Sequence, residues 1–297
     1  MKKSASPIIS CNNITHYYGD RLIYKDLSFT VEQGSILGLL GKNGTGKTTI
    51  INILNGFLKP HSGVCSIFGE HSNALQPQTK ARIGLLLEGH VQHNFFNVIE
   101  IEKFYAPFYA KWNRDVYFEL IEKLHIDKKQ KLSSMSCGQR SQVALGLVFA
   151  QNPDLLILDD FSMGLDPGYR RLFIEFLKDF VTATHKTVFI TSHIIQDMEM
   201  LIDDCIILDY GKIATHQLSK DLIENFRKHI CRSNIDLSKL ANDQRVYSLE
   251  RRNDSWEFCS FGEDDEIRHM LDPFGIDSFD SQQLSLEDVF IGMTGKY

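Results

Sequence analysis

The sequence predicts an α/β protein with a larger domain and a small accessory domain at the carboxyl end. Short apolar runs that predict strands alternate with helical spacings over the first 220 residues, and a glycine-rich loop joins one of those strands to a helix. After residue 220 the apolar stretches become shorter and acidic residues become more frequent. We therefore expect domains at residues 6–220 and 221–297, with a helical lobe at about residues 95–145 of the first.

Composition excludes several classes of protein. The chain has 297 residues, of which 43% are hydrophobic and 24% are charged, as in soluble globular proteins. No apolar run approaches the roughly 20 residues of a membrane-spanning helix, and the amino end lacks the apolar stretch of a secretory signal. The six cysteines form no closely spaced pair, which predicts reduced thiols rather than a zinc site or a disulfide framework. We expect a cytoplasmic protein.

The net charge of −6 is concentrated at the carboxyl end. Residues 221–297 hold 9 lysines and arginines against 16 aspartates and glutamates, whereas the rest of the chain is almost neutral. Proteins that bind nucleic acid usually present a basic face, and this distribution predicts none. We therefore expect no nucleic-acid partner and interpret the acidic end as a solvated surface.

The predicted elements follow one another in a regular order. Strands are expected at residues 8–15, 21–33 and 35–40, and the last of them passes through the glycine-rich loop into a helix that ends at Gly56. There follow a buried strand at residues 82–88, helices between residues 99 and 149, an apolar strand at residues 155–158, a helix after Pro167, a strand at residues 187–191, a further helix, and paired strands around a Tyr210-Gly211 turn. In the accessory domain, residues 264–271 predict a helix.

The glycine-rich loop has the composition of a phosphate site. It spans residues 41–48, with Gly41, Gly46, Lys47 and Thr48 at the fixed positions of a phosphate-binding loop. Glycines let consecutive backbone N–H groups point at phosphate oxygens, the following helix adds the positive end of its dipole, and the lysine and the hydroxyl serve the outer phosphates and Mg²⁺. A plain glycine-rich turn is the alternative, and the preceding strand and following helix disfavour it.

Two carboxylates follow the apolar strand at residues 155–158. Asp159 stands at its tip, where it can hold Mg²⁺ through water, although an aspartate there can also serve as a simple helix cap. Asp160 comes next and is a candidate general base for an attacking water. The two carboxylates and the loop together predict nucleotide hydrolysis.

The residues between these motifs carry a family resemblance. Met135-Ser136-Cys137-Gly138-Gln139 begins a helix some 20 residues before Asp159, and here the chain resembles the ATP-binding cassette (ABC) family, whose signature is Leu-Ser-Gly-Gly-Gln. The resemblance covers about residues 6–220. It implies that Tyr18, or the adjacent Tyr17, stacks on adenine, that Asp166 belongs to a loop that crosses to a partner subunit, and that His193 touches the γ-phosphate.

The resemblance implies a full set of site residues. The residues expected to bind ATP are Tyr18, Gly41, Asn43, Gly44, Thr45, Gly46, Lys47, Thr48, Thr49, Ser136, Gly138, Gln139 and Asp166. Mg²⁺ is expected at Thr48, Asp159 and Glu88. Hydrolysis is expected to use Asp160, His193 and Glu88.

Several positions depart from the family pattern. Glu88 replaces a more common Gln, as in exporter-type relatives, and Asp160 replaces the usual catalytic Glu with a side chain one methylene shorter. Cys137 stands for the first signature glycine, at a tolerant position. Two further stretches, residues 285–295 with the closing sequence Ser-Leu-Glu-Asp-Val-Phe and residues 108–113, resemble segments of bacterial exporter cassettes.

The resemblance also implies how the protein works. Two cassettes would sandwich two ATP molecules head to tail, so the chain needs a second ABC subunit, either a copy of itself or a related chain. It would power separate integral membrane permease subunits from the inner face of the cell membrane, exporting a drug, lipid, polysaccharide or peptide. The alternatives are a non-transport cassette acting on ribosomes or DNA, and an ATP-gated regulatory module with slow turnover.

Overall fold

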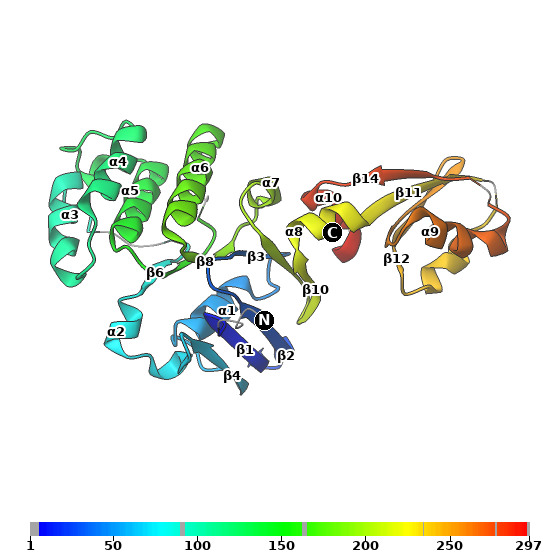
Figure 1. Cartoon of the computed structure of the whole chain (residues 1–297), viewed down its shortest axis with the longest axis horizontal. Helices are drawn as coiled ribbons and strands as arrows, with labels where there is room; N and C mark the ends of the chain where they lie inside the picture. The colour runs from blue at the N-terminus through cyan, green and yellow to red at the C-terminus, as the bar shows by residue number, and fades with distance from the viewer. Residues whose placement is uncertain (1–5, 90–92, 162–164, 234, 277, 296–297) are drawn as a thin grey trace.

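The computed structural model describes residues 6–89, 93–161, 165–233, 235–276 and 278–295. Over these residues the strands form three sheets with the orders β2-β1-β4-β5, β10-β9-β3-β8-β7-β6 and β12-β13-β11-β14 (Figure 1). The protein is therefore a mixed α/β fold, as the sequence predicts.

The first sheet is antiparallel and contains β1 (Ile9–Tyr18), β2 (Arg21–Val31), β4 (Ser62–Ile67) and β5 (Glu70–His71). The second contains the parallel strands β3 (Ile36–Gly41), β6 (Ile83–Leu86), β7 (Leu155–Leu158), β8 (Thr187–Thr191) and β9 (Asp204–Asp209), with β10 (Lys212–Leu218) antiparallel to β9 at its edge. The third is antiparallel and contains β11 (Phe226–Arg232), β12 (Val246–Arg252), β13 (Ser255–Phe261) and β14 (Asp280–Gln283).

The helices connect and cover these sheets. They are α1 (Lys47–Leu54), α2 (Pro77–Lys80), α3 (Val98–Tyr105), α4 (Arg114–Lys123), α5 (Cys137–Ala150), α6 (Pro167–Thr184), α7 (Ile195–Glu199), α8 (Ser219–Asn225), α9 (Asp264–Leu271) and α10 (Leu286–Thr294). Helices α3 to α6 lie together on one side of the central sheet, and α1 lies between that sheet and the first one (Figure 1). Among the described residues, no helix is both long and apolar enough to span a bilayer.

The central sheet is covered on both faces, which explains its unbroken apolar strands. Along β3, Leu37 and Leu39 pack with α1 and the first sheet, whereas Ile36 and Leu40 pack with the helical side. Successive residues of a strand point to opposite faces, so both sets are buried. The carboxyl ends of β3, β8 and β7 consequently lie side by side at one edge of this well-packed sheet.

The accessory region has its own small core and also shares the main one. Residues of β11, β13 and α9 form a separate apolar cluster that includes Phe258 and Leu271. Helix α8 spans the expected domain boundary at residue 220, and Leu286, Val289 and Phe290 of α10 belong to the same core as α7 and the helical side. The division at residue 220 stays a proposal.

Candidate nucleotide site

The glycine-rich loop lies between β3 and α1, and its backbone conformation requires glycine. Gly44 has φ +79° and Gly46 has φ +107°, a region that side chains with a Cβ rarely adopt. Tyr24 closes the loop from β2 because its hydroxyl donates to the Gly46 carbonyl. Thr45 is buried, and its hydroxyl donates to the Lys42 carbonyl over 2.8 Å. The sequence therefore builds a fixed cradle at this edge of the central sheet.

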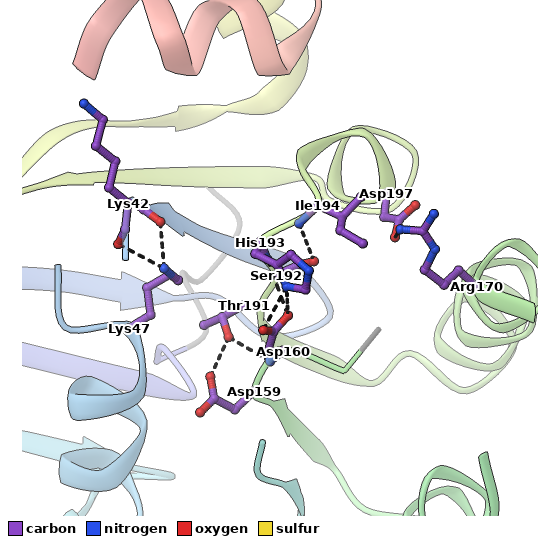
Figure 2. Close-up of polar contacts among 11 residues, drawn as sticks. Lys42, Lys47, Asp159, Asp160, Arg170, Thr191, Ser192, His193, Ile194 and Asp197 are labelled. Carbon is purple, nitrogen blue, oxygen red and sulfur yellow. Dashed lines mark hydrogen bonds and ion pairs between the residues drawn. The ribbon is translucent and has the colours of Figure 1, made fainter. Parts of the chain in front are cut away.

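Lys47 rests on the loop itself. Its Nζ donates to the carbonyl oxygens of Gly41 over 2.7 Å and of Lys42 over 3.1 Å (Figure 2). Burial lowers the pKa of Lys47, and the negative charges of Asp160, Asp159 and Glu88 oppose that shift. The loop thus holds one partly buried ammonium group facing three carboxylates.

Asp159 lies at the end of β7 with one oxygen satisfied. Its side chain is buried, and the hydroxyl of Thr191, at the end of β8, donates to Oδ1 over 2.7 Å. The other oxygen, Oδ2, is buried and has no hydrogen-bond partner in the described part of the chain. Because a buried polar atom without a partner is costly, this oxygen fits a metal ion or a metal-bound water.

Asp160 and His193 form a direct pair. Nδ1 of His193 lies 2.6 Å from Oδ1 and 2.9 Å from Oδ2 of Asp160 (Figure 2). The Asp160 backbone is left-handed, with φ +47°, and its N–H donates to both the carbonyl (3.1 Å) and the hydroxyl (3.0 Å) of Thr191. An aspartate tolerates this conformation better than most residues, so the short side chain suits its backbone.

These groups line one open pocket of about 550 Å³. Its walls are Tyr18, Arg21, Ile23, Asn43, Gly44, Gly46, Lys47, Thr48, Thr49, Glu88, Asp159, Asp160, Thr191 and His193. The lining includes Tyr18, whose hydroxyl lies 3.5 Å from that of Thr49, but not Tyr17, whose ring packs on His61. Gly41 and Thr45 belong to the loop without lining the pocket.

Sequence reasoning missed three residues of this pocket: Arg21, Ile23 and Thr191. Arg21 donates from Nη2 to the Gly44 carbonyl over 3.0 Å. Thr191 precedes the Ser-His pair at the end of β8, beside β7. The parallel order of these strands was the signal that could have identified it, since parallel strands bring their carboxyl ends to one edge.

The signature residues lie outside the pocket. Ser136 caps α5, with its hydroxyl accepting from the Gln139 N–H over 3.1 Å while the Gln139 side chain accepts from the Ser136 N–H over 3.1 Å. Gly138 lies in the first turn of that helix. Asp166 caps α6 by accepting from the Tyr169 N–H, and Gly164 before it falls outside the described residues. Within a single chain, these residues therefore do not line the pocket that contains Lys47.

The fold and the pocket define a nucleotide-binding protein of the phosphate-loop class. The family model described as ABC transporter matches residues 24–162. The Nod factor export ATP-binding protein I of Rhizobium sp. (strain N33) is 30% identical, over 94% of this chain and 94% of its own. The bacitracin transport ATP-binding protein BcrA of Bacillus licheniformis is 28% identical, over 98% of each.

The chain belongs to the ABC transporter family and is one of its ATP-binding, ATP-hydrolysing subunits, which confirms the resemblance. Solved structures agree in fold. One described as the ATP-binding subunit of an ABC transporter has a TM-score of 0.65 at 22% identity, covering 73% of this chain and 92% of that chain. A dimeric ATP-binding cassette in a post-hydrolysis state, bound to ADP and Pi, has a TM-score of 0.63 at 20% identity, covering 71% and 98%.

Proposed function

We propose that this chain binds ATP with Mg²⁺, dimerises around it and hydrolyses it to power a separate membrane-embedded exporter. One observation carries the proposal: a single pocket gathers the phosphate loop, the Asp160–His193 pair, and buried Asp159, whose Oδ2 has no hydrogen-bond partner among the described residues. Relatives named for the export of Nod factor and the transport of bacitracin support the transport role.

Nucleotide binding uses groups that are already in position. Tyr18 lines the pocket and offers its ring to the base, and the backbone N–H groups at the start of α1 are available to the phosphates. Lys47 exchanges its two loop carbonyls for phosphate oxygens, which are stronger, charged partners. Arg21 supports the loop through Gly44.

The residues present fit a magnesium ion. Thr48, Asp159 and Glu88 all line the pocket and supply hard oxygen ligands. Bound Mg²⁺ would neutralise the negative charge that develops on the phosphates. Thr191 keeps Oδ1 of Asp159 occupied, so Oδ2 is the oxygen directed to the ion or to its water.

In hydrolysis, Asp160 and His193 have two different roles. Asp160 accepts a proton from water as the water oxygen bonds to the γ-phosphorus and the bond to ADP breaks. With a proton on each ring nitrogen, His193 donates from Nδ1 to Asp160, which orients the ring, and from Nε2 to the γ-phosphate. Thr191, the last residue of β8, holds the backbone N–H of Asp160, and His193 follows two residues later.

The dimer completes the site. Ser136, Gly138, Gln139 and Asp166 lie at helix amino ends outside the pocket of their own chain, where backbone N–H groups are available to an anion. A second cassette, identical or related, would supply them from the opposite side. The permease subunits would then hold the dimer at the inner face of the membrane.

A slow-turnover, ATP-gated module is the second candidate, and the short side chain of Asp160 favours it. The test is purification of the chain with the membrane protein it serves, reconstituted in vesicles. An exporter subunit copurifies and releases phosphate faster in the complex, with no release in Lys47→Ala. A gating module binds ATP but usually releases it before hydrolysis. A non-transport cassette does not copurify with the membrane protein.

A further inference from the structure

Helix α10 contains the closing sequence of residues 285–295, which nucleotide binding does not explain. It belongs to the accessory region in sequence, yet it returns to the middle of the molecule and lies beside α8 (Figure 1). It contacts α7, α8 and β12. Each of its two ends meets a different part of the nucleotide site.

The carboxyl end of α10 meets the phosphate loop. Nζ of Lys42 donates to the carbonyl of Thr294, the last residue of the helix, over 2.7 Å, and the Lys42 side chain points away from Lys47 toward the red ribbon of α10 (Figure 2). The last carbonyls of a helix lack partners within it and carry partial negative charge. A buried lysine is therefore a well-matched cap.

The same residue reaches Lys47 through its backbone. The Lys42 carbonyl accepts from Nζ of Lys47 over 3.1 Å and from the Thr45 hydroxyl over 2.8 Å. These contacts form a chain from Thr294 through Lys42 to Lys47, the cation that must leave this carbonyl to hold phosphate. The position of α10 thus bears on the loop before and during nucleotide binding.

The amino end of α10 meets the segment that carries His193. The N–H of Leu286 donates to Oε2 of Glu199 over 2.9 Å, and the side chain of Gln196 donates to that of Glu287. Gln196 and Glu199 belong to α7, which begins two residues after His193. A carboxylate at a helix amino end is again the matching charge.

The apolar side of α10 keeps the distance between its ends fixed. Leu286, Val289 and Phe290 are buried in the core that also holds Met198 of α7, and Gly292 lies so close to Phe226 that an added Cβ would come within 2.9 Å of its ring. A nine-residue helix clamped in this way behaves as a rigid spacer.

We propose that α10 positions both halves of the nucleotide site at once, holding the phosphate loop through Lys42 and the His193 segment through Glu199. Lys42 and Glu199 are positioning residues, because each acts through a neighbour. The inference rests on the proposed ATPase function. It assigns the accessory region a direct mechanical link to nucleotide binding and hydrolysis.

The test separates KM from kcat in the full-length chain. Lys42→Met releases the loop, so we expect KM for ATP to rise about three- to tenfold with kcat within about twofold, and Lys42→Arg to recover most of the affinity. Glu199→Ala releases the His193 segment, so kcat should fall about three- to tenfold with KM little changed, and Glu199→Gln should recover most of it. Lys25→Met removes the same charge from an exposed position in the middle of β2 and serves as the control for loss of charge.

The double variant Lys42→Met/Glu199→Ala decides whether one helix connects the two ends. If it does, the loss in kcat/KM is smaller than the product of the single losses, because releasing the second end of a freed helix changes little. Multiplicative losses, a Lys25→Met effect equal to that of Lys42→Met, or normal kinetics in both single variants would overturn the inference. If parent and Lys47→Ala proteins are equally inactive, the proposed function itself fails.

Discussion

At the scale of single residues, Asp160 has the feature most specific to this chain. Its carboxylate contacts His193, and its left-handed backbone is held by two bonds to Thr191. A longer side chain at this backbone would displace the carboxylate by about one C–C bond, and a misplacement of about 1 Å can cost on the order of 100-fold in rate. The aspartate is therefore part of the local geometry.

We predict that Asp160→Glu lowers the steady-state ATPase rate by about 10-fold or more, and that Asp160→Asn abolishes it. Both variants should still bind ATP, because Lys47, Thr48 and Asp159 are unchanged. Phosphate release and nucleotide binding measured on the same samples check this. A faster Asp160→Glu enzyme would mean that the loop accommodates a glutamate, and a fully active Asp160→Asn enzyme would remove Asp160 from the mechanism.

Glu88 is expected to couple the site to the membrane subunits more than to bind nucleotide. It is exposed, lines the pocket and follows β6, where the sheet meets the helical side. Glu88→Gln should leave ATP affinity within a few fold and reduce the stimulation of hydrolysis by the membrane partner. A collapse of ATP affinity in this variant would instead mean that the charge of Glu88 is needed mainly to bind Mg²⁺ and nucleotide, and the coupling role would be wrong.

At the scale of elements, the sequence predicted the strands that are buried on both faces better than the strands that are partly exposed. Strands β3, β7 and β8 are buried on both faces, so their unbroken apolar runs predicted them. Strand β4 was missed because three of its six residues are exposed and include Ser62 and Gly63. The contact between Asp160 and His193, and the approach of Lys42 to α10, depend on spatial register that no local pattern encodes.

Strand β11 places a histidine where its charge is disfavoured. His229 is fully buried between the rings of Phe258 and Phe279 and lies 3.0 Å from the Ser281 hydroxyl. Burial lowers its pKa to about 4, with Asp264 opposing and Arg227 adding to the shift. The native state therefore prefers the neutral ring.

We predict that acid destabilises the accessory region through this residue. Above the unfolded-state pKa of about 6.5, His229 is neutral in both the native and the unfolded state. As the pH falls from 6.5 toward 4, protonation favours the unfolded state, and the free energy of unfolding decreases by roughly 3 kcal/mol at most. Thermal melting of parent and His229→Gln proteins between pH 7 and 4 checks this. The variant should melt lower at pH 7 but lose less stability in acid, and parallel pH profiles would contradict the prediction.

At the scale of the whole molecule, the site is divided between two surfaces. Lys47 and the carboxylates line the pocket, whereas Ser136 and Asp166 lie outside it. If two copies complete each other, Mg²⁺ and ATP should convert the Asp160→Asn protein from monomer to dimer, because ATP is bound and persists. Light scattering checks this, and a monomer at saturating ATP would favour a related chain as the partner.

The family membership, the pocket and the transport proposal all require that this chain hydrolyse ATP through its phosphate loop. Phosphate release by the purified chain with Mg²⁺ and ATP, compared between the parent and Lys47→Ala proteins, tests this most directly. Lys47 is partly buried and donates to two carbonyls of its own loop, so its loss should leave the fold intact, with a melting temperature that changes by no more than a few degrees. We predict turnover by the parent and none by the variant. Equal phosphate release by two folded proteins would contradict the account.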